Sequence, residues 1–156
     1  MSGTLTPAPR WAVVTTGLLS LIGLGLSLYL TIAHFRGTSI LACSETGAVN
    51  CALVTTSKYS RFLGMPVAVL GLGHYVVTTA LNSPWAWRSS QRWIHLARVG
   101  LALVGFGFIL WLIAAELVFL NHICLWCTGV HVVTLALLLV LSRVSPSQLG
   151  WAGANA

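Results

Sequence analysis

Four long runs of apolar residues dominate the chain, and the shorter stretches between them hold nearly all of its charge. The runs extend over residues 11–35, 62–81, 99–120 and 123–141. About 20 apolar residues in a helix are enough to cross a hydrocarbon layer roughly 30 Å thick. Helices satisfy their own backbone hydrogen bonds in lipid. The pattern therefore predicts an all-α integral membrane protein, a bundle of four transmembrane helices.

The polar stretches set the expected organisation around these runs. Residues 1–10 and 143–156 are tails rich in small residues, Pro and Ser, expected to be poorly ordered on either side of a membrane domain at 11–142. The longest connection, 36–61, holds two cysteines, and a loop of this length is usually functional or disordered. A short helix is predicted near 50–57 with Asn50 as its cap, and Pro66 is predicted to begin the second helix.

Two features of the runs have a second interpretation. The first run, flanked by Arg10, resembles a signal peptide, but it is longer than an apolar region of roughly 7 to 15 residues and no small-x-small cleavage site follows. Glycines in the first and third runs either allow close helix approach or reflect the high glycine content of membrane helices. They are Gly17, Gly23, Gly25, Gly100, Gly105 and Gly107.

Charge gives the predicted bundle an orientation. The chain has eight basic residues against two acidic ones, and basic residues near helix ends stay in the cytoplasm. Five of the eight fall on the side of the termini and the second connection, which predicts both termini inside. They are Arg10, Arg88, Arg92, Arg98 and Arg143, against Arg36, Lys58 and Arg61 outside. This topology explains the net charge of +6 without a nucleic-acid partner.

Four cysteines carry the chemistry that the sequence suggests. Cys43 and Cys51 lie in the long loop, and Cys124 and Cys127 open the fourth run, so all four fall on the outer, oxidising side, where disulfides persist. The positive end of a helix stabilises a thiolate, which makes a Cys-x-x-Cys pair at that position ready to exchange disulfides.

Two other interpretations of the cysteines are open. A fixed disulfide across one helical turn stabilises little, because it closes a short loop. A zinc site could use all four sulfurs. However, one pair lies at the membrane boundary, and "CSETGAVNC" places seven residues between its cysteines. A redox role without metal or flavin is favoured, in which the loop pair collects electrons from a soluble dithiol and the helix pair passes them to a lipid-soluble acceptor such as a quinone.

Four stretches, in this order and spacing, make the sequence similar to the vitamin K epoxide reductase family, specifically to its bacterial disulfide-forming members. They are "SLYL" at the end of the first run, "CSETGAVNC", "TTSKYSRFLGMPVAVLGL" with Ser57, and "ICLWC". The resemblance covers about residues 17–141. It implies a four-helix bundle around a quinone, with a long extracytoplasmic loop between the first and second helices over the pocket.

The resemblance also implies a role for each cysteine. Cys43 exchanges with a thioredoxin-like partner, Cys51 passes electrons to Cys124, and Cys127 reduces a quinone of the menaquinone, ubiquinone or vitamin K type. Many bacterial relatives carry a fused thioredoxin-like domain, so a chain ending at Ala156 is expected to use a separate extracytoplasmic partner. The expected location is the bacterial inner membrane.

Two further residues are candidates for quinone binding. His131 lies one turn below Cys127, so it is predicted to hydrogen-bond or protonate a quinone carbonyl; its alternative is a hydrogen bond to a neighbouring helix. Ser57 matches a family serine near the quinone pocket, and its alternative is a helix cap.

Two more residues are candidates for a polar or proton-transfer role. Glu116 is the only acid in a predicted span, where ionisable residues are usually functional, but it could also reach the interface or pair with His122. His74, midway along the second run, is favoured as an interhelical hydrogen bond over a ligand. The other histidines and tryptophans expected to be interfacial anchors include His34, His95, Trp85, Trp87 and Trp93.

The sequence therefore predicts a quinone-dependent membrane thiol oxidoreductase that reoxidises a thioredoxin-like partner and supports disulfide formation in exported proteins. One alternative uses the same residues to reduce vitamin K epoxide or quinone, with thiols as the reductant. An alternative of another class is a structural or transport membrane protein whose cysteines form two inert disulfides.

Overall fold

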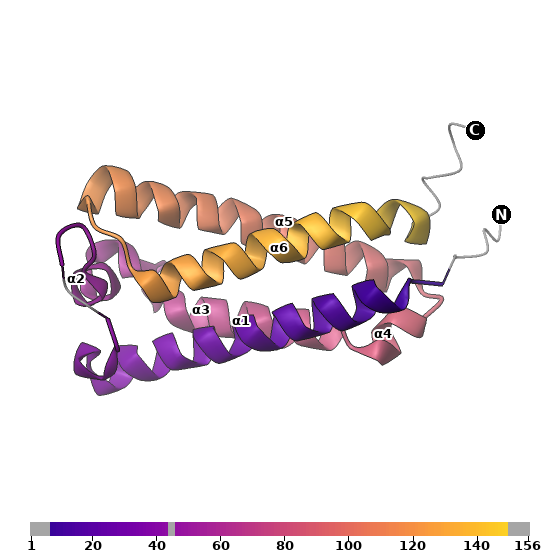
Figure 1. The fold of residues 1–156 in the computed structure, drawn as a ribbon, viewed down its shortest axis with the longest axis horizontal. Helices are drawn as coiled ribbons and strands as arrows, with labels where there is room; N and C mark the ends of the chain where they lie inside the picture. Colours follow the sequence, from indigo (N-terminus) through magenta and orange to yellow (C-terminus); the bar gives the residue numbers. More distant parts are fainter. Residues whose placement is uncertain (1–6, 44–45, 150–156) are drawn as a thin grey trace.

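Four long helices lie side by side in the computed structural model, which describes residues 7–43 and 46–149. They are α1 (Arg10–Arg36), α3 (Val67–Leu81), α5 (Arg92–Ala114) and α6 (Leu125–Gln148). Figure 1 shows that α1 begins and α6 ends at one end of the bundle, whereas the loop with α2 (Cys51–Thr56) lies at the other. The predicted helical architecture is confirmed.

Three helical segments of the described chain are long and apolar enough to cross a membrane. They are α1, α6, and α5 together with the π-helical η3 (Ala115–Leu120) that continues it. Helix α3 is apolar but has only 15 residues. The protein is thus a multi-pass helical membrane protein, and a fourth crossing by α3 remains a prediction.

The second apolar run begins as a helix later than predicted. Residues 62–66 belong to a small hairpin in which β1 (Arg61–Phe62) pairs antiparallel with β2 (Met65–Pro66). Pro66 is the N-cap of α3, so the predicted place of this proline at the helix start is confirmed. The apolar side chains of the hairpin had extended the hydrophobic pattern beyond the helix itself. Between α1 and the hairpin, the loop also contains two 3-10 turns, η1 (Thr38–Ile40) and η2 (Lys58–Ser60).

The last helix also differs from the prediction at both ends. It begins at Leu125, with Cys124 as its N-cap, rather than at residue 123. It continues to Gln148, so residues 143–148 are helical where a poorly ordered tail was predicted. The pattern missed this extension because Val144 is buried in a cluster with residues of α1 and of the second connection. The other predicted tail residues, 1–6 and 150–156, lie outside the described residues.

Helix α5 begins at Arg92 rather than at residue 99 because its first turns bury polar groups. The Arg98 guanidinium donates to the Leu81 carbonyl at 2.6 and 3.0 Å and to His95 Nδ1 at 3.1 Å. It also lies 3.7 Å from the centroid of the Trp87 ring, which belongs to α4 (Pro84–Arg88). The carbonyl end of α3 and the electron-rich ring stabilise the cation without a carboxylate.

This network corrects one prediction about interfacial anchors. His95 and Trp87 are buried structural groups, whereas Trp85 and Trp93 are exposed, as an interfacial position requires. The spacing of aromatic residues around the second connection did not distinguish the buried rings from the exposed ones. The buried rings are those that contact Arg98, and the sequence pattern does not show these contacts.

Close helix approach explains two of the six glycines considered above. A Cβ at Gly23 of α1 would fall inside the buried Tyr75 ring of α3, and a Cβ at Gly105 of α5 would lie 2.8 Å from the His74 ring. The Tyr75 hydroxyl is held by Thr134 of α6 at 2.8 Å, so the ring has little freedom to move. The other four glycines face open space: Gly17, Gly25, Gly100 and Gly107.

Gly23→Ala is expected to destabilise the bundle, because the added methyl group displaces Tyr75. Overpacking of this kind costs about 1–3 kcal/mol. Gly25→Ala is the matched control in the same helix, and its added methyl group meets open space, so the alanine leaves stability unchanged or raises it slightly. Thermal unfolding of both variants in detergent micelles measures the difference, and equal midpoints would contradict the close packing at Gly23.

Candidate functional site

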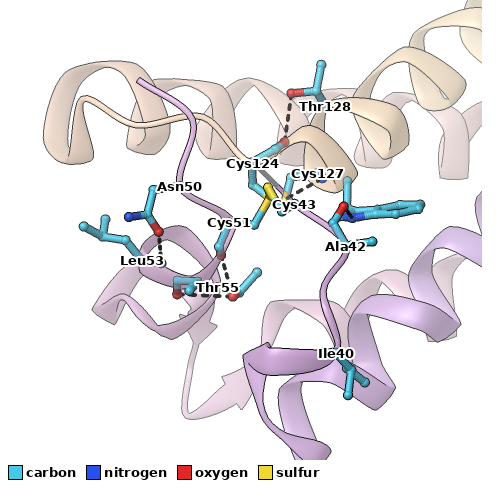
Figure 2. Close-up of a disulfide and its surroundings, with 12 residues drawn as sticks. Ile40, Ala42, Cys43, Asn50, Cys51, Leu53, Thr55, Cys124, Cys127 and Thr128 are labelled. Atoms are coloured by element: carbon cyan, nitrogen blue, oxygen red, sulfur yellow. Dashed lines mark hydrogen bonds between the residues drawn. A yellow bond between two sulfur atoms is a disulfide. The ribbon is translucent and has the colours of Figure 1, made fainter. Parts of the chain in front are cut away.

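All four cysteines meet at the loop end of the bundle. Cys51 and Cys124 are 1% and 0% exposed, and Cys43 and Cys127 pack against the same apolar cluster. Cys43 and Cys51 form a disulfide, whereas Cys124 and Cys127 are free thiols. Figure 2 shows the disulfide next to the start of α6. The two pairs, 73 residues apart in sequence between Cys51 and Cys124, therefore adjoin in space.

A short parallel backbone pairing docks the loop onto the segment before α6. The Ile123 N–H donates to the Ala48 carbonyl at 2.8 Å, and the Asn50 N–H donates to the Ile123 carbonyl at 3.1 Å. Because Asn50 precedes Cys51 and Ile123 precedes Cys124, this pairing brings the two cysteines into one cluster. The Asn50 side chain also caps α2, so the predicted helix and its cap are confirmed.

Tyr29 and Trp126 hold the other arm of the loop. The Tyr29 hydroxyl donates to the Ile40 carbonyl at 2.6 Å and accepts from the Ala42 N–H at 3.0 Å. The Trp126 indole donates to the Ala42 carbonyl at 3.2 Å, and the two rings lie 4.6 Å apart. The aromatic pair thus fixes the residue before Cys43. Sequence reasoning gave neither residue a role, although each lies inside a motif that carried the family resemblance.

Cys124 is positioned to exist as a thiolate. As the N-cap of α6, its sulfur accepts a hydrogen bond from the Cys127 N–H at 3.5 Å, drawn dashed in Figure 2. Hydrogen bonding from the Cys127 side chain, and then from the Cys127 and Trp126 amides, lowers the pKa of Cys124 from 9.0 to about 7, although burial opposes this shift. The Cys124 thiolate therefore forms more readily than that of an ordinary cysteine.

Glu116 lies beside this cysteine pair, in the π-helical η3. Its side chain is buried, and the carboxyl group interacts with the Cys127 side chain and the Cys124 backbone amide. His122 instead uses Nδ1 to donate to the Leu120 carbonyl at 2.8 Å. The alternatives in which Glu116 reaches the interface or pairs with the His122 side chain are therefore wrong. Single π-helical turns are often found at functional sites.

A cavity of about 400 Å³ lies next to the cysteines, between α1, α3, α5, η3, α6 and the loop. Small-molecule sites have volumes of roughly 300–1,000 Å³ and are mostly apolar with a few polar groups. The wall here is mostly apolar, and Cys127 is the one of the four cysteines that lines it. The polar side chains of the wall include every other residue predicted for the site: Ser57, His74, Glu116 and His131.

These polar residues of the cavity wall differ in their positions and in their hydrogen-bond partners. His131 is buried on α6, one turn beyond Cys127. Ser57 ends α2 and donates to the Val54 carbonyl at 2.8 Å, so it is both a cap and part of the wall. The described residues offer the His74 ring no hydrogen-bond partner, and its contact with α5 is packing against Gly105 rather than the suggested interhelical hydrogen bond.

The geometry separates the cysteines by what each can reach. Cys51 of the loop disulfide is buried in one cluster with Cys124, whereas Cys127 lines the cavity. Within residues 7–43 and 46–149, no group of three or more His, Cys, Asp or Glu side chains could hold a metal ion. An arrangement of two adjacent cysteine pairs, one facing a cavity, is suited to thiol–disulfide exchange coupled to a bound acceptor.

The model of the vitamin K epoxide reductase family matches residues 14–142. The chain belongs to this family. Members of the vitamin K epoxide reductase family are oxidoreductases that act on thiols and disulfides, and they use quinones or vitamin K. The family predicted from "CSETGAVNC" and "ICLWC" is confirmed. The match includes all four cysteines of the site and most of each of the four long helices.

In this member of the vitamin K epoxide reductase family, the Cys127 side chain is expected to control the ionisation of Cys124. Cys127→Ala removes the largest cause of the lowered pKa, so the Cys124 thiolate should form at higher pH than in Cys127→Ser, which keeps a side-chain donor. The rate of Cys124 alkylation by iodoacetamide, followed by mass spectrometry from pH 5 to 10, measures the midpoint. The same midpoint in both variants would show that the side chain has no such effect.

Proposed function

We propose that the protein is a quinone-dependent thiol oxidoreductase of the bacterial inner membrane that reoxidises a separate, extracytoplasmic thioredoxin-like protein. The observation that carries the proposal is the grouping of the cysteines: Cys127 lines the cavity of about 400 Å³, Cys124 is buried in the same cluster as Cys51, and Cys43 and Cys51 form the loop disulfide. This grouping connects a soluble dithiol to a cavity suited to a quinone head group.

The exchange steps follow from this grouping and balance in electrons. The partner's thiolate attacks Cys43, and the partner's second thiol then releases Cys43 and Cys51 as a dithiol while the partner becomes a disulfide. Cys51 attacks Cys124 of an oxidised Cys124–Cys127 pair and frees the Cys127 thiolate. Cys43 then attacks Cys51, which restores the loop disulfide and leaves Cys124 and Cys127 with two electrons for the quinone.

The structure has the cysteine pairs in the state that follows this transfer. The loop pair is oxidised and the pair facing the cavity is reduced. Two electrons are therefore held next to the place where a quinone would accept them. Free thiols at Cys124 and Cys127 also weigh against the alternative of two inert disulfides.

The remaining site residues are proposed to manage protons and to orient the quinone. The Glu116 carboxylate accepts the proton of the Cys127 thiol, with which it interacts, and so raises the nucleophilicity of that sulfur. His131 and Ser57 face the same cavity and are proposed to hydrogen-bond the quinone carbonyls. His74 lies deeper along α3 in the same wall.

The proposed topology has four membrane crossings, with α3 as the shortest, both termini in the cytoplasm and all four cysteines outside. Its support is the bias of basic residues toward the side of the termini, together with the position of α2, which begins at Cys51, at the opposite end of the bundle in Figure 1. The other three cysteines belong to the same cluster as Cys51. The membrane domain then extends beyond the predicted boundary at residue 142, since α6 continues to Gln148.

The quinone dependence is tested by trapping thiols in membranes with and without quinone. In the proposed cycle, quinone converts the Cys124–Cys127 pair from dithiol to disulfide, and Cys127→Ala abolishes oxidation of a thioredoxin-like dithiol. Cys127→Ser is the control for a mere change in packing, and it should be equally inactive. A pair that ignores quinone, or a Cys127→Ala variant with full activity, would falsify the proposal.

The order of the relay is tested separately at Cys43. Cys43→Ala should lose electron transfer from the protein partner yet keep quinone reduction by a small dithiol such as dithiothreitol, which can reduce Cys124 and Cys127 directly. The measurement is quinol formation with each reductant. An equal loss with both reductants would contradict the assignment of Cys43 to the partner.

A further inference from the structure

A stripe of polar side chains extends along α3 from the cavity toward the end of the bundle that holds the termini. The stripe consists of His74, Thr78 and Asn82, the last of which caps the C-terminus of the helix. They are spaced by four residues and therefore share one helix face. Thr78 is 7% exposed and Asn82 is 1% exposed. Polar groups buried at membrane depth are costly, and they usually mark a pathway for ions or protons. The thiol chemistry described above gives no role to Thr78 or Asn82.

Two atoms of this stripe lack hydrogen-bond partners. Thr78 Oγ1 and Asn82 Oδ1 are buried and unpaired within the described part of the chain. The amide nitrogen of Asn82 is satisfied, since it donates to Ser20 Oγ at 3.1 Å. Unpaired buried polar atoms in a native protein require an explanation, and an ordered water molecule is the usual one.

A small void lies where that water molecule is needed. Its volume is about 10 Å³, and its wall includes Thr78, Asn82, Arg98 and His74. A void needs roughly 10–15 Å³ to hold one water, together with two to four polar partners. Arg98 uses three of its N–H groups on Leu81 and His95, which leaves donors for a water molecule.

The void is continuous in its lining with the quinone cavity. His74 and Thr134 belong to the walls of both. Thr134 in turn holds the Tyr75 hydroxyl, which lies in the cavity wall, and Ser27 contributes a third unpaired oxygen to that wall. Polar atoms therefore extend from the cavity through His74 and the void to Arg98. The opposite end of the cavity lies next to the cysteine cluster.

We propose that this stripe is a water-mediated proton route, by which the quinone takes its protons from the side of the membrane that holds the termini. The proposal rests on the proposed function, because it needs a quinone in the cavity. Thr78 and Asn82 hold the water molecule, and His74 passes the proton into the cavity. Arg98 provides a fixed positive charge beside the water, which opposes the free passage of hydronium when no negative charge develops at the quinone.

The route changes what the reaction does as a whole. Oxidation of the partner's dithiol to a disulfide releases two electrons and two protons. Both protons leave on the loop side in this scheme, including the one that Glu116 accepts from Cys127. The quinone accepts those two electrons and takes up two protons from the other side to become the quinol. Each turnover then removes two protons from the side of the termini and adds two on the side of the loop, so thiol oxidation generates a membrane potential. No further oxidant or reductant is needed.

Proteoliposomes measure the side from which the protons come. The protein is reconstituted with decylubiquinone, with menaquinone-4 in parallel, and a pH-sensitive dye is trapped in the lumen. Reduced thioredoxin, which does not cross the bilayer, is added outside and so drives only the molecules whose loop faces outward. We expect the lumen to become alkaline as quinol forms, with a proton-to-quinol ratio near two, and a protonophore to abolish the change.

Variants of α3 test the residues of the route. Thr78→Val removes the hydroxyl group with little change in shape and should slow quinol formation and lumen alkalinisation by at least about tenfold. Thr79→Val is the matched control, because the Thr79 hydroxyl donates back to the Tyr75 carbonyl and does not line the void. The rate at which thioredoxin reduces the loop disulfide should be the same in both variants and in the wild type.

The outcomes separate this inference from the proposed function. Quinol formation in the wild type without a change in lumen pH would overturn the proton route and leave the thiol-to-quinone reaction intact. Equal rates in Thr78→Val and Thr79→Val would overturn the role of the stripe in the same way. Failure to form quinol with either quinone would overturn the proposed function, and the route with it. The wild-type measurement decides the matter even if the Thr78 variant does not fold.

Discussion

The site depends on a pairing between two short pieces of backbone, in which Ile123 donates to Ala48 and accepts from Asn50. A connection between helices at the membrane surface has few other ways to hold one geometry, because water satisfies its backbone groups equally well. By pairing with the segment before α6, the loop places one cysteine pair against the other. Tyr29 and Trp126 then fix the second arm, so a long connection becomes a defined cover over the cavity.

The two ends of the bundle bury polar groups in different ways. At the loop end, buried thiols and Glu116 adjoin a cavity, so the polar groups that cost most to bury are those available for chemistry. At the other end, Arg98 is buried without a carboxylate partner and is stabilised by the end of α3 and the face of Trp87. That cation anchors α3, α4 and α5 to one another, and it gives the shortest helix of the bundle a fixed end.

Much of this structure was predictable where it depends on local pattern, and not where it depends on distant contacts. Apolar length predicted the helices, and the spacing of the cysteines predicted the family. The hairpin before α3 was missed because Phe62 and Met65 are apolar, as the residues of a membrane-spanning helix are. The last turns of α6, residues 143–148, were missed because Val144 is buried by packing in a cluster with α1, which lies far away in the sequence. The position of Glu116 beside Cys127 depends on a π-helical turn that no sequence pattern revealed.

The capping role of Cys124 has a consequence for how its variants are interpreted. The sulfur that exchanges electrons is also the atom that accepts the Cys127 N–H and closes the first turn of α6. Catalysis and local folding thus share one atom. Replacement by alanine removes both functions together, so a loss of activity would have two causes. Serine is a strong N-cap and cannot form a disulfide, so it preserves the helix start while it removes the electron transfer. The side chain chosen at position 124 decides which of the two is measured.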